Sequence, residues 1–284
     1  KPFDYKFIEI KLSELKSHYY ELFLPKTKIP VEDSVFTEVY ENHLFGRDFP
    51  FSKRVIYMLV NNKPIKFEYI DNHYLGDDSW QLAGATQRFK EELIRKLRLF
   101  KEGDIYSPAQ FTITDNEREL FHFSYSSFQR VTNWRQYEIE DSELENLEIH
   151  LKKDLVSNDL TKIAETYFAN SYEVNDFKIK FINLITALES LFNRSNNQIS
   201  QILSRHLAVL ISNDKESFQE NYRRIKKLYG IRSKLVHGQT IETKESIENL
   251  VDEMYTLTRV ALIKCMELNL TKDELFEELN SKGY

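Results

Sequence analysis

The chain has 284 residues, and 45 Asp and Glu against 39 Lys and Arg give it a formal net charge of −6. An acidic balance of this size excludes a protein coated with phosphate-binding charge, although it allows a local basic patch. The hydrophobic fraction of 41% excludes a disordered chain and is sufficient for one large domain or two modest ones. The single cysteine, Cys265, excludes an internal disulfide framework and any zinc site of the Cys-x-x-Cys type.

The sequence also lacks membrane and secretion signals. No stretch approaches the roughly 18 uncharged apolar residues of a transmembrane helix, and the segment KPFDYKFIEIK at the start has no signal-peptide core. We expect Cys265 to be a small buried hydrophobe within a helix. Together these features predict a cytoplasmic protein with no membrane partner.

The first part of the chain is predicted to be mixed α+β. Apolar and polar residues alternate in five segments, which predicts one strand and two hairpins. These segments are 5–11, the pair 55–60 and 65–70, and the pair 110–115 and 119–125. Between the hairpins, residues 85–100 have helical periodicity, with Phe89, Leu93, Leu97 and Phe100 on one face, and Gly103 is expected to end the helix.

The second part is predicted to be an all-α up-and-down bundle. All six prolines lie within the first 108 residues, and proline breaks helices. Helical periodicity and capping residues predict helices over 141–169 (with an interruption near 157–159), 176–193, 198–212, 216–237, 244–269 and 271–280. Short connections favour antiparallel neighbours. We place the boundary within 130–145, which predicts an α+β sensor or regulatory domain over 1–138 and a helical bundle over 139–284.

The absence of several catalytic and cofactor-binding motifs narrows the range of reactions that the chain could catalyse. The chain has no GxGxxG, no GxxxxGK[ST] and no GxSxG, and none of its seven histidines forms HExxH or HxH. We therefore expect no cofactor and no metal site, and an enzyme of this sequence would work by acid–base and electrostatic means.

One segment reverses the charge of the chain. Residues 221–237 (NYRRIKKLYGIRSKLVH) contain six Lys and Arg residues and no acidic residue. Such a run is either a solvated helix face or a track for a phosphate backbone. Arg232 and His237 favour the second interpretation, because guanidinium grips phosphate and imidazole transfers protons near neutral pH. On a continuous helix the two residues differ by about 140° in rotation and about 7.5 Å in rise, so the spacing alone is a weak signal.

Three segments strengthen this signal. LITALESLFN (184–193), ISQILSRHLAVL (199–210) and IKKLYGIRSKLVHG (225–238) resemble, in this order and spacing, an Apea-like HEPN domain. The resemblance covers roughly residues 140–280 and implies a helical bundle that cleaves RNA without a metal through an Arg-x4–6-His motif, usually across a homodimer. It assigns phosphate binding to Arg232 and proton transfer to His237. Ser233 stands where many HEPN enzymes have a polar amide.

Further residues are candidates for support or RNA contact, each with a structural alternative. Glu189 lies on an apolar helix face and needs a partner, which either Arg205 or Arg232 could supply; a structural ion pair and a direct catalytic role both fit. Arg205 is a stronger candidate than His206 for lining a site. Lys234 fits an RNA contact and a snorkelling surface lysine equally well. The remaining candidates are Ser233, Tyr229, Arg223 and Lys227.

Three functions follow as hypotheses. The first is a metal-independent HEPN endoribonuclease of anti-phage defence or toxin type. It would act on RNA such as tRNA as a homodimer joined through the bundle, and a phage-derived or cellular trigger would bind the N-terminal domain. The second is a non-catalytic module that binds RNA or a protein. The third places the main activity in the N-terminal part and leaves only dimerisation to the bundle.

Overall fold

The chain forms two compact units in a computed structural model. The first comprises Lys1–Glu92 with Tyr106–Gln129, and the second Leu93–Ile105 with Arg130–Tyr284. The structure describes the strands named below and residues 79–103, 105, 137–194, 197–240 and 245–282, with side-chain surroundings from residue 87 onward outside the strands. Most of residues 1–78 lie outside the described residues, and so does the predicted fold of that region as a whole.

The described strands of the first unit pair two by two, all antiparallel. The pairs are β1 (Tyr5–Lys11) with β2 (Val55–Asn61), β3 (Phe67–Ile70) with β4 (His73–Asp77), and β5 (Ala109–Ile113) with β6 (Phe121–Tyr125). The last pair agrees with the second predicted hairpin. The first predicted hairpin differs, because β2 pairs with β1 and not with β3. A ladder between two seven-residue strands satisfies more backbone groups than the four-residue β3 can offer to β2.

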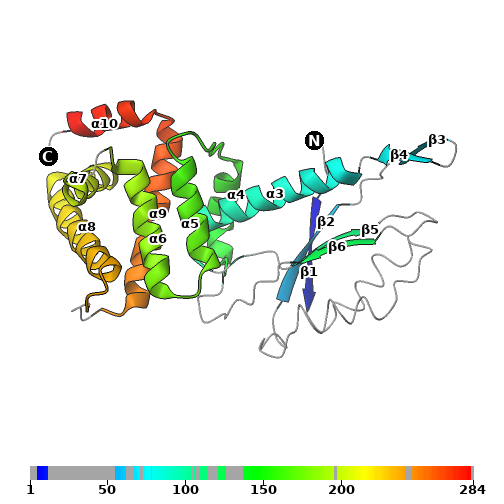
Figure 1. Ribbon diagram of the computed structural model, residues 1–284, viewed down its shortest axis with the longest axis horizontal. Coiled ribbons are helices and arrows are strands. Elements are labelled where there is room, and N and C mark those ends of the chain that lie inside the picture. The colour runs from blue at the N-terminus through cyan, green and yellow to red at the C-terminus, as the bar shows by residue number, and fades with distance from the viewer. Residues whose placement is uncertain are drawn as a thin grey trace. The chain divides into compact units, whose positions relative to one another are not determined.

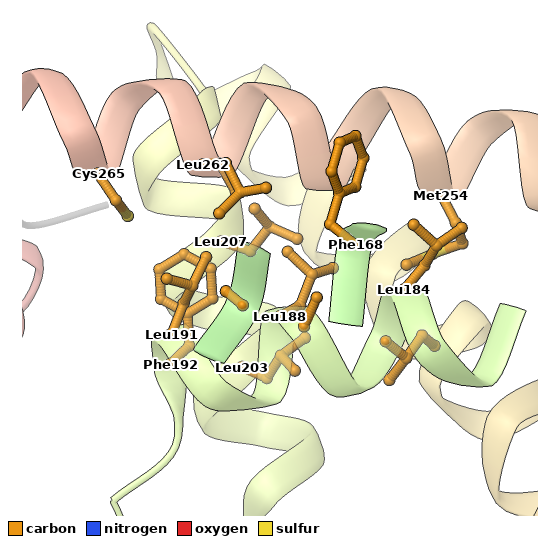
Figure 2. Packing of buried hydrophobic residues seen from close by; sticks show 14 of the residues in the cluster. Phe168, Leu184, Leu188, Leu191, Phe192, Leu203, Leu207, Met254, Leu262 and Cys265 are labelled. Carbon is orange, nitrogen blue, oxygen red and sulfur yellow. The ribbon is translucent and has the colours of Figure 1, made fainter. Parts of the chain in front are cut away.

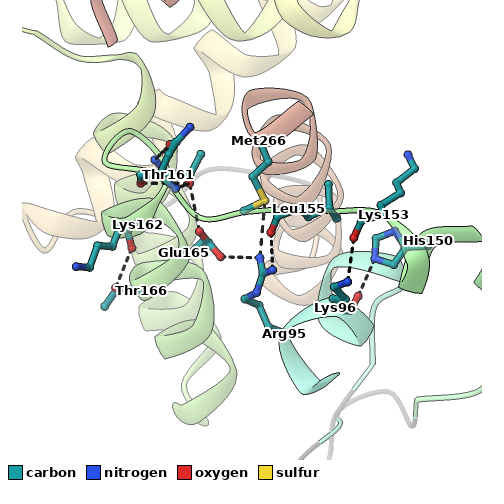
Figure 3. A network of polar contacts seen from close by, with 11 residues as sticks. Arg95, Lys96, His150, Lys153, Leu155, Thr161, Lys162, Glu165, Thr166 and Met266 are labelled. Carbon is teal, nitrogen blue, oxygen red and sulfur yellow. Dashed lines mark hydrogen bonds and ion pairs between the residues drawn. The ribbon is translucent and has the colours of Figure 1, made fainter. Parts of the chain in front are cut away.

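Helix α3 (Ser79–Phe100) ends inside the second unit. Leu99 is 1% exposed there, and Arg95 Nη1 donates to Glu165 Oε2 over 3.0 Å (Figure 3). After the helix, Gly103 has a φ of 138°, and a Cβ at this position would lie 2.6 Å from the Cα of Tyr137. The predicted boundary at 138/139 therefore separates residues 93–105 from the unit in which they pack.

The rest of the second unit is helical (Figure 1). A 3₁₀ turn, η4 (Asp141–Glu143), precedes α4 (Leu144–Lys152), α5 (Lys162–Glu173), α6 (Phe177–Phe192), α7 (Ile199–Ile211), α8 (Lys215–Val236), α9 (Ile247–Leu268) and α10 (Lys272–Ser281). The predicted interruption near 157–159 is confirmed. There, Asn158 N donates to Thr161 Oγ1 over 3.1 Å and Thr161 N donates to Asn158 Oδ1 over 3.0 Å, which replaces helical hydrogen bonds.

The core of this unit surrounds α6, which packs against α5, α7, α8 and α9. Four apolar residues at helical spacing form the buried stripe of α6 and are at most 2% exposed: Phe181, Ile185, Leu188 and Phe192. Figure 2 shows Leu203 and Leu207 of α7 and Met254 and Leu262 of α9 in the same cluster. Cys265 is fully buried there, as predicted, and burial raises the pKa of its thiol to about 12.

The helical bundle predicted from periodicity is thus the fold of the second unit as far as it is described. Within the described residues, none of the helices is both long enough and apolar enough to cross a membrane.

Candidate functional site

The site is built at the C-terminal end of α8. The helix runs without a break through Gly230 to Val236, and His237 is its C-cap residue. Gly238 follows with a φ of 66°, its N–H donates to Leu235 O over 3.1 Å, and Gln239 N donates to Lys234 O over 2.8 Å. These two bonds form a Schellman motif, which requires a left-handed residue at the position of Gly238. The chain therefore turns away from the helix axis immediately after His237.

The two glycines of this segment allow a matched test of stability. Gly230 is exposed within the helix, and a Cβ at this position would have no atom within 4 Å, so Gly230→Ala should raise the free energy of unfolding by about 0.5–1 kcal/mol. Gly238→Ala meets no clash either but forces alanine into the left-handed region, and it should cost about 1–2 kcal/mol. Urea unfolding of the two variants measures both shifts. Two shifts of the same sign would contradict this account.

The Arg232 side chain is anchored by one carboxylate. Its Nη2 donates to Glu189 Oε2 over 3.3 Å, and the hydroxyl of Tyr229 donates to Glu189 Oε1 over 2.8 Å. The guanidinium also lies 5.9 Å from the centre of the Tyr229 ring. Burial, and secondly the bond to Glu189, raises the pKa of Tyr229 to about 12, so the hydroxyl stays protonated and keeps donating. Of the two predicted partners for Glu189, the structure selects Arg232.

A second arginine of α8 is held more firmly. Arg224 makes four hydrogen bonds, two to the carboxylate of Glu245 and two to that of Glu253. Lys227 Nζ lies 3.3 Å from Glu245 Oε1. Hydrogen bonds from Arg224 and then Lys227 lower the pKa of Glu245 to about 2, so this carboxylate is charged at neutral pH. This network could not be predicted from the sequence, because both carboxylates follow the basic segment and meet it only through the fold.

Carboxylates therefore neutralise three of the six cations in residues 221–237. Arg224, Lys227 and Arg232 form ion pairs, whereas Arg223, Lys226 and Lys234 form none with another described residue. Ser233 is partly buried and His237 is exposed, and within the described residues the His237 ring makes no hydrogen bond. Among the described residues, the end of α8 thus presents an imidazole without a hydrogen bond, together with an arginine that is held at one nitrogen.

Arg205 and His206 contribute to a different place. Arg205 Nη1 donates to Asn280 Oδ1 over 3.0 Å, and His206 Nε2 lies 3.1 Å from the same oxygen. The His206 ring also packs edge-on against Phe276. Both side chains therefore fasten α10 to α7, and neither contacts Glu189. The prediction that Arg205 supports the Arg232 site finds no contact in its favour.

Buried histidines make the stability of the fold sensitive to acid. Burial lowers the pKa of His206, to which Arg205 and Arg194 add, and burial likewise lowers the pKa of His150, whose ring bonds to Lys96 O. The unfolded chain therefore binds protons first as the pH falls below about 6.5, and the free energy of unfolding should decrease from there towards pH 5. Urea unfolding at several pH values measures this slope. Replacing His206 or His150 by Gln should flatten it, and replacing both should flatten it further; an unchanged slope in the double variant would contradict the assignment.

Metal ligands do not gather within the described part of the chain, where no three His, Cys, Asp or Glu side chains lie close enough to hold an ion. No family model, curated protein or solved structure matches the chain.

Proposed function

We propose that the protein is a metal-independent endoribonuclease of HEPN type that cleaves RNA with Arg232 and His237. The observation that supports the proposal is the end of α8, where an exposed imidazole with no hydrogen bond to another described residue follows an arginine that uses only one nitrogen in its contact with Glu189. The proposal also rests on the resemblance of the sequences of α6, α7 and α8 to an Apea-like HEPN domain. That resemblance also underlies the proposed role in anti-phage defence or toxin-type growth arrest.

The reaction requires a proton acceptor, a proton donor and a positive charge. The imidazole of His237 takes the proton of the 2′-hydroxyl, the 2′-oxygen bonds to phosphorus, and the bond from phosphorus to the 5′-oxygen breaks. A protonated imidazole, which His237 of the partner subunit supplies in a homodimer, returns a proton to the leaving 5′-oxygen. The guanidinium of Arg232 neutralises the charge that grows on the phosphate oxygens. The products are a 2′,3′-cyclic phosphate and a 5′-hydroxyl.

Cleavage of total RNA and of tRNA in EDTA tests the proposal. Cutting that persists in EDTA, leaves cyclic-phosphate ends and is lost in Arg232→Ala supports it. The Lys215→Ala variant is the matched control, since it removes an exposed cation at the other end of the same helix, outside residues 221–237, that forms no ion pair with a described residue. Cutting that survives Arg232→Ala, or that stops in EDTA, would overturn the proposal.

The second candidate function is a non-catalytic module that binds RNA or a protein. The observation that favours it is the ion pair of Arg232 with Glu189, because a guanidinium already matched by a carboxylate of its own chain has less charge to offer a transition state. Retention of RNA at low salt without any cutting by the parent protein would select this function.

The pairing also predicts how binding depends on salt. Single-stranded RNA should bind the His237→Ala protein with a slope of log K against log salt of about −2 to −3, which corresponds to three unpaired cations with or without Arg232. Engagement of all six cations of the segment would give a slope of about −4. Fluorescence anisotropy of labelled RNA over a salt series measures the slope. The steeper value would mean that the ion pairs of Arg224 and Lys227 open when RNA binds.

A further inference from the structure

Two arginines of α8 differ in how much of their hydrogen-bonding capacity the fold uses. Arg224 has all three of its nitrogens bonded to the carboxylates of Glu245 and Glu253. Arg232 has one: within the described residues, the contact from Nη2 to Glu189 is the only hydrogen bond of its guanidinium. Its Nε is buried and has no hydrogen-bond partner among the described residues, and the side chain as a whole remains 25% exposed.

The carboxylate that holds Arg232 is itself fixed from the other side. The 2.8 Å bond from the Tyr229 hydroxyl to Oε1 is shorter than the 3.3 Å contact from Arg232 to Oε2. The side chain of Glu189 is 15% exposed and belongs to the central helix α6, which packs against α5, α7, α8 and α9. The Tyr229 hydroxyl therefore fixes the carboxylate of Glu189, and this carboxylate accepts a hydrogen bond from one terminal nitrogen of Arg232.

We propose that Glu189 and Tyr229 are positioning residues, which hold Arg232 by its Nη2 so that its other terminal nitrogen, Nη1, meets the phosphate of an RNA chain. This inference rests on the proposed function, because it concerns how Arg232 serves the same reaction. The ion pair of Glu189 is then more than an architectural contact. A guanidinium fixed at one end keeps its planar fork in one orientation, which is what stabilisation of a developing charge requires. Arg224, by contrast, is a structural arginine.

Steady-state cleavage by four variants tests the proposal. Each rate is divided by the fraction of that variant that is folded. Glu189→Ala should lower kcat about tenfold or more, with the KM for RNA changed less than about threefold. Glu189→Gln should restore part of the loss, because its amide oxygen still accepts from Nη2. Tyr229→Phe should lower kcat by a smaller factor. Glu253→Gln, the matched control, should leave kcat unchanged because it loosens Arg224 only.

A second measurement does not depend on cleavage. Phenylglyoxal modifies accessible arginines, and mass spectrometry of the peptides gives the rate at Arg232 in each intact variant. This rate should rise severalfold in Glu189→Ala and Tyr229→Phe and stay constant in Glu253→Gln. An unchanged rate at Arg232, or equal kcat in Glu189→Ala and the parent, would overturn the positioning role. Absence of cutting by the parent, with the modification rates as expected, would reject the nuclease and retain the support of Arg232.

Discussion

Replacing His237 by alanine should slow RNA cleavage by about 10²- to 10⁴-fold, which is the usual contribution of a positioned general acid or base. The fold should tolerate the change. His237 is exposed at the end of α8, and it contributes its backbone, not its ring, to the turn that Gly238 closes. Exposed substitutions of this kind alter the free energy of unfolding by less than about 0.5 kcal/mol. Loss of activity therefore cannot be attributed to loss of folded protein.

Single-turnover cleavage of a labelled RNA, alongside thermal unfolding of each protein, measures the effect. Gln239→Ala is the matched control, since Gln239 is exposed two residues further along the same turn. It should cleave at the parental rate. A His237→Ala protein that cuts within about threefold of the parent would assign proton transfer to another group. Equal losses in both variants would indicate a general effect of the turn and would contradict a specific role of the imidazole.

Local signals in the sequence were enough to predict most helices of the second unit. The helix predicted over 176–193 is α6, and it begins after Asp176, whose carboxylate accepts hydrogen bonds from the N–H groups of Lys178 and Ile179. The helix predicted over 216–237 is α8, which ends at Val236 with His237 as its C-cap residue. Such signals act within one or two turns, so they can be read from adjacent residues without knowledge of the fold.

Contacts between distant segments were harder to predict. Glu189 needed a cationic partner, but the sequence could not decide between Arg205 and Arg232, since each lies on a helix that follows α6 in the chain. The choice depends on which face of α7 meets α6, and that face turns Arg205 towards Asn280. The burial of Leu99 was missed for a similar reason. Periodicity placed Phe89 on the buried face, yet Phe89 is 38% exposed, because the partners of the last turns of α3 come from other helices.

The second large effect is expected for a substitution in the last turns of α3, where Leu99 is buried. Leu99→Ala in the full-length chain should lower the free energy of unfolding of the helical unit by about 2–5 kcal/mol, because it leaves a cavity where a side chain was 1% exposed. The melting temperature should fall by on the order of 5–15 °C. Leu144→Ala is the matched control, since Leu144 is 53% exposed and the same substitution there should cost less than about 1 kcal/mol. Similar losses in the two variants would contradict the packing of α3 in this unit.

The same packing determines where the helical unit can be cut from the chain. Arg259 Nε donates to Arg98 O over 3.0 Å, and Arg259 Nη1 donates to Glu102 Oε2 over 3.3 Å. Removing residues 93–105 strips the 6% exposed Arg259 of these partners, and a buried charge without its partner costs about 3–5 kcal/mol. Together with the loss of Leu99, this approaches the 5–15 kcal/mol or so by which proteins are stable. A fragment of residues 139–284 should therefore be largely unfolded by circular dichroism, and a folded, cooperatively melting fragment would show that α3 is dispensable.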